Sequence, residues 1–247
     1  MEYVLKTNAL CKNYKNFKAL NGLTMNVPKG AIYGFVGKNG AGKTTTLRCI
    51  ATLLKPTDGT VIVDGHDTVK EPEAVRASIG FLTNEIKLDP QFSARYLFDF
   101  FGRLHQVPED KLKERREELF SYFGIDGFED KKIEELSTGM KQKAAIAVSL
   151  VHDPDIVIFD EPTSGLDIIT ARSVTDYLLE LKKKGKLVIV STHIMSEAEK
   201  LCDRLVVIID GRKVSEGTLD NIYSDTGKDN LEDAFFELYR LNHKEDR

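Results

Sequence analysis

The sequence predicts an α/β fold in which a mixed sheet is flanked by helices, with an N-terminal antiparallel β subdomain and an inserted α-helical subdomain. Two observations predict the core. A strand, a glycine-rich turn and a helix follow one another over residues 31–50, and strands alternate with helices from residue 155 onward. A third predicts the insertion, because residues from about 85 to 150 lack strand patterns and repeat apolar side chains at helical spacing. We expect one domain over residues 1–247.

Each part of this fold has a local signal in the sequence. Residues 1 to about 35 form short β-like runs, with turns at Lys15-Asn16 and Pro28-Lys29-Gly30. The helical repeats of the inserted part are Leu97, Phe98, Phe101 and Leu104, then Leu112, Leu119, Phe120 and Phe123, the second helix starting at Pro108. The later strands are expected at 156–160, 187–191 and 204–210, and the later helices at 170–184 and 195–202. The tail, about 218–247, is expected to end in an amphipathic helix.

The turn after the first core strand has the composition of a phosphate-binding loop. Residues 37–45 read Gly-Lys-Asn-Gly-Ala-Gly-Lys-Thr-Thr and fit the pattern G-x-x-x-x-G-K-[ST]. Glycines let the backbone approach an anion closely, and the N–H groups of a helix N-terminus point at phosphates. A chance glycine-rich turn is the alternative, but the strand before it and the helix after it favour nucleotide binding.

Within this loop, Lys43 is expected to place its charge on the β and γ phosphates, and the Thr44 hydroxyl is expected to bind Mg²⁺. The residues expected to contact the nucleotide are Gly37, Asn39, Gly40, Gly42, Lys43, Thr44 and Thr45.

Composition and charge fit a soluble enzyme. The net charge is −4, so no global basic field indicates nucleic acid as a partner. No uncharged apolar stretch approaches the roughly 18 residues of a membrane span, and the N-terminus has no apolar signal segment. Cys11, Cys49 and Cys202 lack C-x-x-C spacing, which favours reduced thiols in the cytosol over a disulfide framework or a zinc site.

A second chemical element follows about 110 residues after the loop. An apolar strand ends in Asp160 and Glu161, which places two carboxylates at the edge of the sheet where open α/β sheets bind ligands. We expect Asp160 to reach Mg²⁺, directly or through water, and Glu161 to polarise a water molecule against the γ phosphate. Because many buried strands end in Asp-Glu, this interpretation depends on the phosphate loop upstream.

With these elements in order, the chain resembles the nucleotide-binding subunits of ATP-binding cassette (ABC) transporters over nearly its whole length. Residues 136–142 resemble the family signature, and residues 164–167 resemble the D-loop. His193, after the strand 188–192, resembles the switch histidine, and Tyr14 stands where the family has the aromatic side chain that stacks on adenine. The resemblance implies an ABC ATPase with a P-loop NTPase core.

The signature has a physical logic of its own. Ser137 is expected to cap a helix over 140–150, with Gly139 as a position of close approach. Such a helix N-terminus can hold an anion, although an ordinary capped helix is the alternative. The resemblance implies that Ser137 and Gly139 meet the γ phosphate held by a partner subunit, so that two chains enclose two nucleotides head to tail. On the same ground, Asp167 of the D-loop is expected at the nucleotide.

The chain departs from the family pattern in two places. Thr138 and Met140 stand where the family usually has Gly and Gln, a variation similar to that of drug- and sodium-exporter ATPases. Asn84 stands near the position of the Q-loop glutamine. It keeps the amide but is one methylene shorter, so it is either a ligand to Mg²⁺-bound water or a turn residue.

The sequence therefore predicts an ATP-binding and ATP-hydrolysing subunit that powers export by a membrane ABC transporter, with ATP and Mg²⁺ as cofactors. Lys43, Glu161 as general base and His193 are expected to be catalytic. The expected partners are a second copy of the chain and separate transmembrane permease subunits, without nucleic acid, on the cytoplasmic face of the cell membrane. Sodium, drug or peptide antibiotic remain open as substrates. A soluble assembly ATPase, such as an iron–sulfur scaffold partner, is the alternative.

Overall fold

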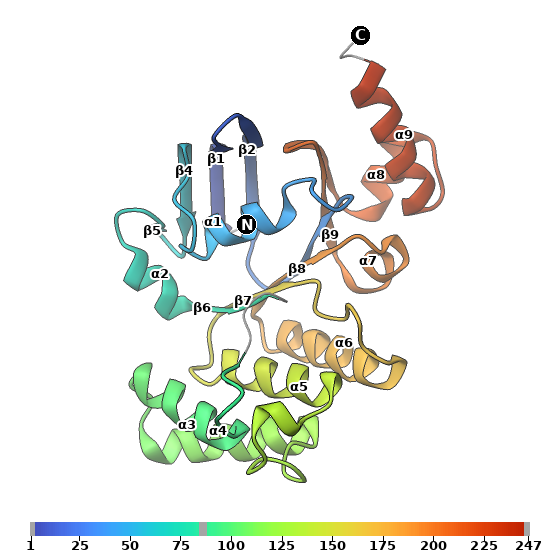
Figure 1. Ribbon diagram of the computed structural model, residues 1–247. Coiled ribbons are helices and arrows are strands. Elements are labelled where there is room, and N and C mark those ends of the chain that lie inside the picture. Colours follow the sequence, from blue (N-terminus) through green and yellow to red (C-terminus); the bar gives the residue numbers. More distant parts are fainter. Residues whose placement is uncertain (1–2, 84–87, 245–247) are drawn as a thin grey trace.

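The computed structural model describes residues 3–83 and 88–244, which form two sheets and the helices around them (Figure 1). The first sheet is antiparallel with strand order β2-β1-β4-β5. The second has the order β10-β9-β3-β8-β7-β6, in which only β10 runs antiparallel to its neighbour. This arrangement confirms the predicted α/β class with an N-terminal antiparallel part.

The antiparallel sheet is dominated by one long hairpin. β1 (Tyr3–Tyr14) and β2 (Phe17–Pro28) are joined at the predicted Lys15-Asn16 turn, where Lys15 adopts a left-handed φ of 50°. Both strands span 12 residues, so they are longer than the short runs expected from the sequence. β4 (Asp58–Val63) and β5 (His66–Asp67) complete the sheet.

The six-stranded sheet brings the candidate functional residues together, because its parallel strands end side by side. Its strands are β3 (Ile32–Val36), β6 (Ile79–Leu82), β7 (Ile156–Asp160), β8 (Leu187–Thr192), β9 (Arg204–Ile209) and β10 (Arg212–Gly217). The register pairs Val36 with Thr192 and Asp160 with Ser191. The carboxyl ends of β3, β8 and β7 therefore meet at one edge.

The helices that were predicted begin and end close to the predicted positions. They are α1 (Lys43–Ile50), α2 (Pro72–Ser78), α3 (Ala94–Leu104), α4 (Glu109–Phe123), α5 (Thr138–Ser149), α6 (Ile168–Lys183), α7 (Met195–Leu201), α8 (Leu219–Thr226) and α9 (Leu231–Lys244), with a 3₁₀ turn at Ile133–Glu135. α3, α4 and α5 lie below the six-stranded sheet in Figure 1, and α8 and α9 lie at its upper right. α2 and α8 were not among the helices predicted from the sequence.

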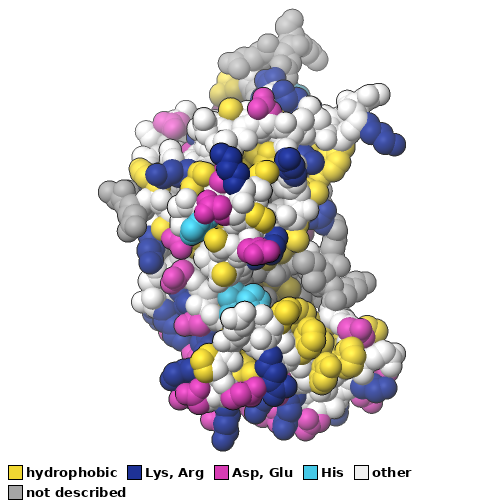
Figure 2. All heavy atoms as spheres, turned by 90° about the vertical axis from the view of Figure 1, so that its left-hand side faces the viewer, with side chains coloured by type: hydrophobic (Ala, Val, Ile, Leu, Met, Phe, Trp, Pro, Cys, Tyr) yellow, Lys and Arg dark blue, Asp and Glu magenta, His cyan; other side chains and the backbone are white. Residues whose placement is uncertain are grey.

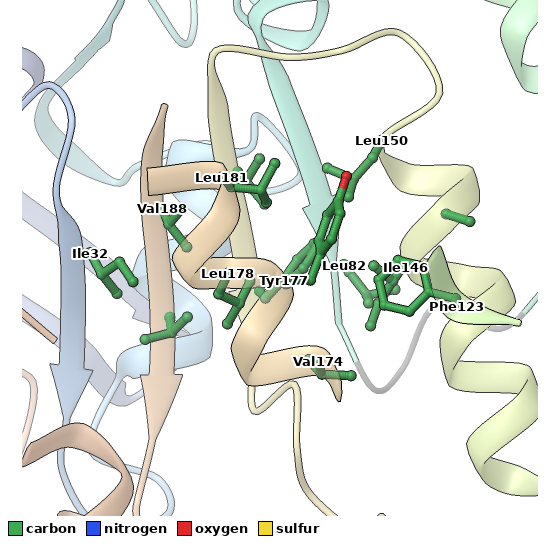
Figure 3. Close-up of a cluster of buried hydrophobic side chains, with 14 of the residues drawn as sticks. Ile32, Leu82, Phe123, Ile146, Leu150, Val174, Tyr177, Leu178, Leu181 and Val188 are labelled. Carbon is green, nitrogen blue, oxygen red and sulfur yellow. The ribbon is translucent and has the colours of Figure 1, made fainter. Parts of the chain in front are cut away.

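Buried side chains join the helices to the sheet. Figure 3 shows Ile32 and Val188 of the sheet, Leu178 of α6, and Phe123 of α4 in one cluster. A second cluster fills the other face of the sheet, where Phe35, Ile158 and Ile189 meet α1 and the antiparallel sheet. Apolar burial on both faces fixes the strands, and therefore the residues at their ends.

Candidate nucleotide-binding site

The loop between β3 and α1 has a backbone that only glycine fits at key positions. Gly40 and Gly42 adopt φ of 79° and 109°, a region that disfavours other residues. A Cβ on Gly37 would lie 2.4 Å from the carbonyl oxygen of Ile208. Gly42 also precedes the first turn of α1, so the loop leads directly into a helix N-terminus.

Lys43 is held inside this loop. Its side chain is 4% exposed, and Nζ donates to the carbonyl oxygens of Gly37 at 2.7 Å and Lys38 at 3.1 Å. Burial lowers the pKa of the Lys43 amine, and the negative charges of Glu161 and Asp160 oppose that shift. The cation is thus fixed at the centre of the loop, where it faces two carboxylates.

Both carboxylates come from the end of β7, and Ser191 on the neighbouring β8 orients them. The Ser191 hydroxyl donates a short hydrogen bond to Oδ1 of Asp160. The backbone N–H of Glu161 donates to the carbonyl oxygen of Ser191 at 3.1 Å and to its hydroxyl at 3.2 Å. These bonds hold Glu161 at a φ of 51°, a left-handed conformation that costs about 1–3 kcal/mol in a non-glycine residue.

His193 follows β8 directly and reaches the same point. Its Nδ1 lies 3.0 Å from Oε1 of Glu161, and that oxygen lies 4.0 Å from Nζ of Lys43. The fold therefore brings together the three residues expected to be catalytic, although they are far apart in the sequence.

The signature, residues 136–142, and the D-loop, residues 164–167, pack against each other. Ser137 caps α5 by accepting a hydrogen bond from the N–H of Met140 at 3.3 Å. A Cβ on Gly139 would lie 3.1 Å from Thr170 Oγ1 and 3.5 Å from Asp167 Oδ2. Among the described residues, no hydrogen bond or ion pair connects Ser137 or Gly139 with Lys43.

Asp167 is the N-cap of α6. Its Oδ1 accepts from the N–H groups of Ile169 and Thr170 at 3.0 Å, and its Oδ2 accepts from the Thr170 hydroxyl at 2.8 Å. These hydrogen bonds, first those from Thr170, hold the pKa of Asp167 below its ordinary value. Asp167 and Gly139 share Thr170 as a neighbour, so the two segments are packed together.

The other expected residues have different surroundings. Tyr14 is exposed at the end of β1, with Lys12 Nζ 5.4 Å from its ring centroid. Asn39 is exposed in the loop, whereas Thr44 and Thr45 begin α1. Asn84 lies outside the described residues, so its predicted role stays a prediction.

Three features of the site were missed from the sequence. Ser191 was signalled only by its place in the strand beside β7. Gln142 Nε2 donates to the carbonyl oxygen of Pro162 at 3.2 Å, which ties α5 to the segment after β7. The C-terminal helix α9 also reaches the loop, since Lys38 Nζ lies 5.0 Å from the ring centroid of Tyr239.

A phosphate loop that faces an acidic strand end and a histidine, on a sheet of this topology, defines a P-loop ATPase. The chain belongs to the ABC transporter family, whose family model matches residues 20–164. It is an ATP-binding, ATP-hydrolysing subunit of that family. Among the described residues, no helix combines the length and apolarity needed to cross a membrane.

Three relatives of known family can be aligned with most of this chain. It is 40% identical to the ABC transporter ATP-binding protein NatA of Bacillus subtilis, over 90% of each chain. It is 38% identical to the daunorubicin resistance ATP-binding protein DrrA3 of Streptomyces coeruleorubidus, over 93% of this chain and 73% of the relative. It is 36% identical to the Nod factor export ATP-binding protein I of Paraburkholderia xenovorans, over 87% of this chain and 71% of the relative.

Solved structures give the same result for the fold. An ATP-binding subunit of an ABC transporter superposes with a TM-score of 0.90 at 28% identity, over 96% of this chain and 99% of the other. A dimeric ATP-binding cassette with ADP and phosphate bound superposes with a TM-score of 0.81 at 28% identity, over 87% and 98%.

Proposed function

We propose that this chain, acting as a single domain, powers export through a membrane transporter by hydrolysing ATP in a site completed by a second copy. The observation that carries this proposal is the contact of Glu161 with His193, beside the buried Lys43. The proposal is supported by a buried cation, suited to phosphate, that lies 4.0 Å from a carboxylate suited to activate water.

Each of these residues has a distinct role in the proposed reaction. The loop N–H groups and Lys43 bind the phosphates and stabilise the charge that develops on them. Glu161 accepts the proton of the attacking water. His193 holds the Glu161 carboxylate through Nδ1 and presents its other ring nitrogen towards the γ phosphate. Tyr14 stacks on the base.

The residues at the loop also fit a magnesium ion. The Thr44 hydroxyl makes no hydrogen bond with the rest of the described chain, and Asp160 uses Oδ1 for Ser191, which leaves Oδ2. A hydroxyl and a carboxylate are hard oxygen ligands of the kind that Mg²⁺ prefers. Bound there, the ion would neutralise phosphate charge.

The second copy supplies what one chain lacks. Ser137 and Gly139 lie at the exposed N-terminus of α5 and make no contact with Lys43 of their own chain. A head-to-tail dimer would place them at the γ phosphate bound by the partner, and would place Asp167 beside it. The similarity to a dimeric cassette holding ADP and phosphate supports this arrangement.

A groove beside α3 fits the permease. It has a volume of about 340 Å³ and lies among α2, β6, α3, α5 and the segment that follows α1. Its lining is mostly apolar, with Leu53, Phe81, Phe101 and Val148 among the residues, and it contains the stacked rings of His105 and His152. Figure 2, which views the molecule from the left-hand side of Figure 1, shows hydrophobic side chains gathered at the lower right, beside histidine side chains. A short apolar segment of a transmembrane subunit would occupy this groove on the cytoplasmic face of the membrane.

The names of the relatives favour export over a soluble assembly role. They include proteins for daunorubicin resistance and Nod factor export. The substrate of this chain is not specified by the ATPase site, because the cargo does not need to touch it.

Isolation from native membranes tests the proposal. A tagged chain should co-purify with a multi-span membrane protein that raises its ATPase rate. Leu53→Glu, at an exposed position in the groove, should break the complex and leave the ATPase activity of the free chain unchanged. Val69→Glu, at another exposed apolar position, is the matched control and should keep the complex. A chain found only in soluble assemblies would contradict the proposed function.

A further inference from the structure

Two exposed isoleucines follow the D-loop. Ile168 and Ile169 are the first residues of α6, directly after Asp167, and are 86% and 78% exposed. Asp167 caps the helix beneath them through the N–H groups of Ile169 and Thr170, so the backbone that carries them is fixed. Two adjacent, almost fully exposed β-branched apolar residues on a rigid helix end favour contact with another surface.

A pocket of matching character lies beside the phosphate loop. The α9 pocket, of about 680 Å³, has five apolar or aromatic lining residues, Ile194, Met195, Phe235, Phe236 and Tyr239. Its other lining residues are Lys38, Asn39, His193, Ser196 and Glu232. Phe236 is 60% exposed although it lies in an apolar surrounding. The pocket thus combines apolar side chains of α9 with residues of the nucleotide site.

Polar contacts hold α9 in this position. Asp210, after β9, pairs with Lys38 of the loop at 3.0 Å and with His243 of α9 at 3.1 Å. The ring of Tyr239 stacks on that of His243, with centroids 4.1 Å apart, and faces the Lys38 amine. The pocket therefore keeps a defined place relative to the phosphate loop.

The isoleucines and the signature are packed into one local arrangement. Gly139 packs against Thr170 and Asp167, which adjoin Ile168 and Ile169 in the chain. In the proposed dimer, Gly139 of one copy lies at the phosphate held by Lys43 of the other. Its isoleucines, one and two residues after Asp167, then lie close to that same phosphate loop. Lys38, in the loop, and His193, beside Glu161, both line the α9 pocket.

We propose that Ile168 and Ile169 of one copy insert into the α9 pocket of the second copy when the ATP-bound dimer forms. This inference rests on the proposed function and extends the interface from the signature to the C-terminal helix. α9 thereby becomes part of the surface that closes on ATP. Continuity with the nucleotide site selects a second copy of the chain as the occupant of the pocket.

Cross-linking between two singly labelled copies tests the contact. Ile169→Cys in one copy and Phe236→Cys in another are combined in a Glu161→Gln, Cys11→Ser background, which retains ATP without cleavage. Cys49 and Cys202 do not interfere, because both are buried and burial raises the pKa of their thiols to about 11 and about 12. A short bismaleimide should join the mixed pair with ATP and not with ADP, and should not join Ile169→Cys to Leu104→Cys, an exposed position on α3.

Affinity measurements give the second readout. Changing Ile168 and Ile169 together to Ser, or Phe236 to Ser, should weaken the ATP-dependent dimer at least about tenfold. The combined variant should be weakened little further, because both changes remove one contact. A Glu161→Gln dimer that forms normally but gives no mixed cross-link, or that tolerates these changes, overturns this inference alone. Failure of Glu161→Gln to dimerise with ATP overturns the proposed function as well.

Discussion

The imidazole of His193 and the carboxylate of Glu161 are in contact, with Nδ1 of the one 3.0 Å from Oε1 of the other. The contact arises because β7 and β8 are parallel neighbours, so the residues that follow them meet at the same sheet edge. The turn at Glu161 directs its side chain towards the phosphate loop, and His193 holds it there.

The first prediction concerns this contact. His193→Ala should lower kcat by at least about tenfold and change the KM for ATP much less, because it removes the group that holds the base, whereas the loop N–H groups and Lys43 supply most of the binding to the phosphates. Steady-state kinetics measure kcat and KM separately. A thermal unfolding midpoint equal to that of the wild type is the control. An unchanged kcat would show that Glu161 keeps its orientation without the histidine.

The second prediction concerns Lys43. Replacing it with Ala should abolish hydrolysis and weaken ATP binding by roughly 10- to 100-fold or more, the scale of a lost charged hydrogen bond. Calorimetric titration with ATP measures the affinity. Lys43→Met, which keeps most of the buried volume, should behave in the same way, since the charge is what matters. Near-normal turnover in either variant would exclude the phosphate-loop role.

The third prediction concerns the base. Tyr14→Ala should weaken ATP binding by about 1–3 kcal/mol, the range of a base–aromatic stack, whereas Tyr14→Phe should be mild. Both changes are made at an exposed side chain, so folding should be unaffected. Equal losses in the two variants would assign the effect to the hydroxyl, and no loss would remove Tyr14 from the site.

The fourth prediction concerns pH. The rings of His105 and His152 stack with centroids 3.9 Å apart, and Nε2 of His152 donates to the carbonyl oxygen of Ile79. Burial, and next the charge of His105, lower the pKa of His152 to about 4 from its ordinary 6.5. Between these pH values the unfolded chain binds more protons than the folded one. The contribution of His152 to stability is therefore complete above pH 6.5 and is lost as pH falls towards 4.

Unfolding midpoints measured from pH 7 to 4.5 should fall more steeply in the wild type than in His152→Gln. His105→Gln should also flatten the slope, because it removes the smaller cause of the shift at His152 and because burial lowers the pKa of His105 itself. Parallel slopes in all three proteins would mean that carboxylates alone account for the acid sensitivity.

The parts of the site that the sequence revealed are those carried by local patterns. The phosphate loop needs its glycines at fixed spacing, and the acidic pair needs only the end of one apolar strand. Ser137 was identified as a cap because helix starts have a short-range signature. The same rule explains one error of position: α6 begins at Ile168, two residues earlier than expected, because Asp167 is its N-cap.

What the sequence did not reveal depends on distant contacts or on overlooked short-range signals. α8 is framed by a Thr218–Asn221 capping box and by Gly227 in a left-handed conformation, signals that are visible in the sequence but were not used. The place of α9 beside the loop could not be predicted, because it depends on Lys38, Asp210 and His243 meeting across the fold. Ser191 likewise became identifiable only once the order of the strands was known.

The central claim is that one chain binds ATP and two chains hydrolyse it, with Ser137 and Gly139 of each copy at the γ phosphate of the other. Glu161→Gln keeps the size and hydrogen bonding of the side chain but removes the base, so ATP should bind and persist. Because ATP would bind the dimer more tightly than the monomer, it should shift the equilibrium towards the dimer.

Light scattering of Glu161→Gln with no nucleotide, with ADP and with ATP tests this claim most directly. The account predicts a monomer in the first two conditions and a dimer with ATP. Adding Ser137→Arg should abolish the dimer while ATP binding through Lys43 remains. A dimer equally stable with ADP, or one untouched by the change at Ser137, would contradict the account and leave the signature as an ordinary helix cap.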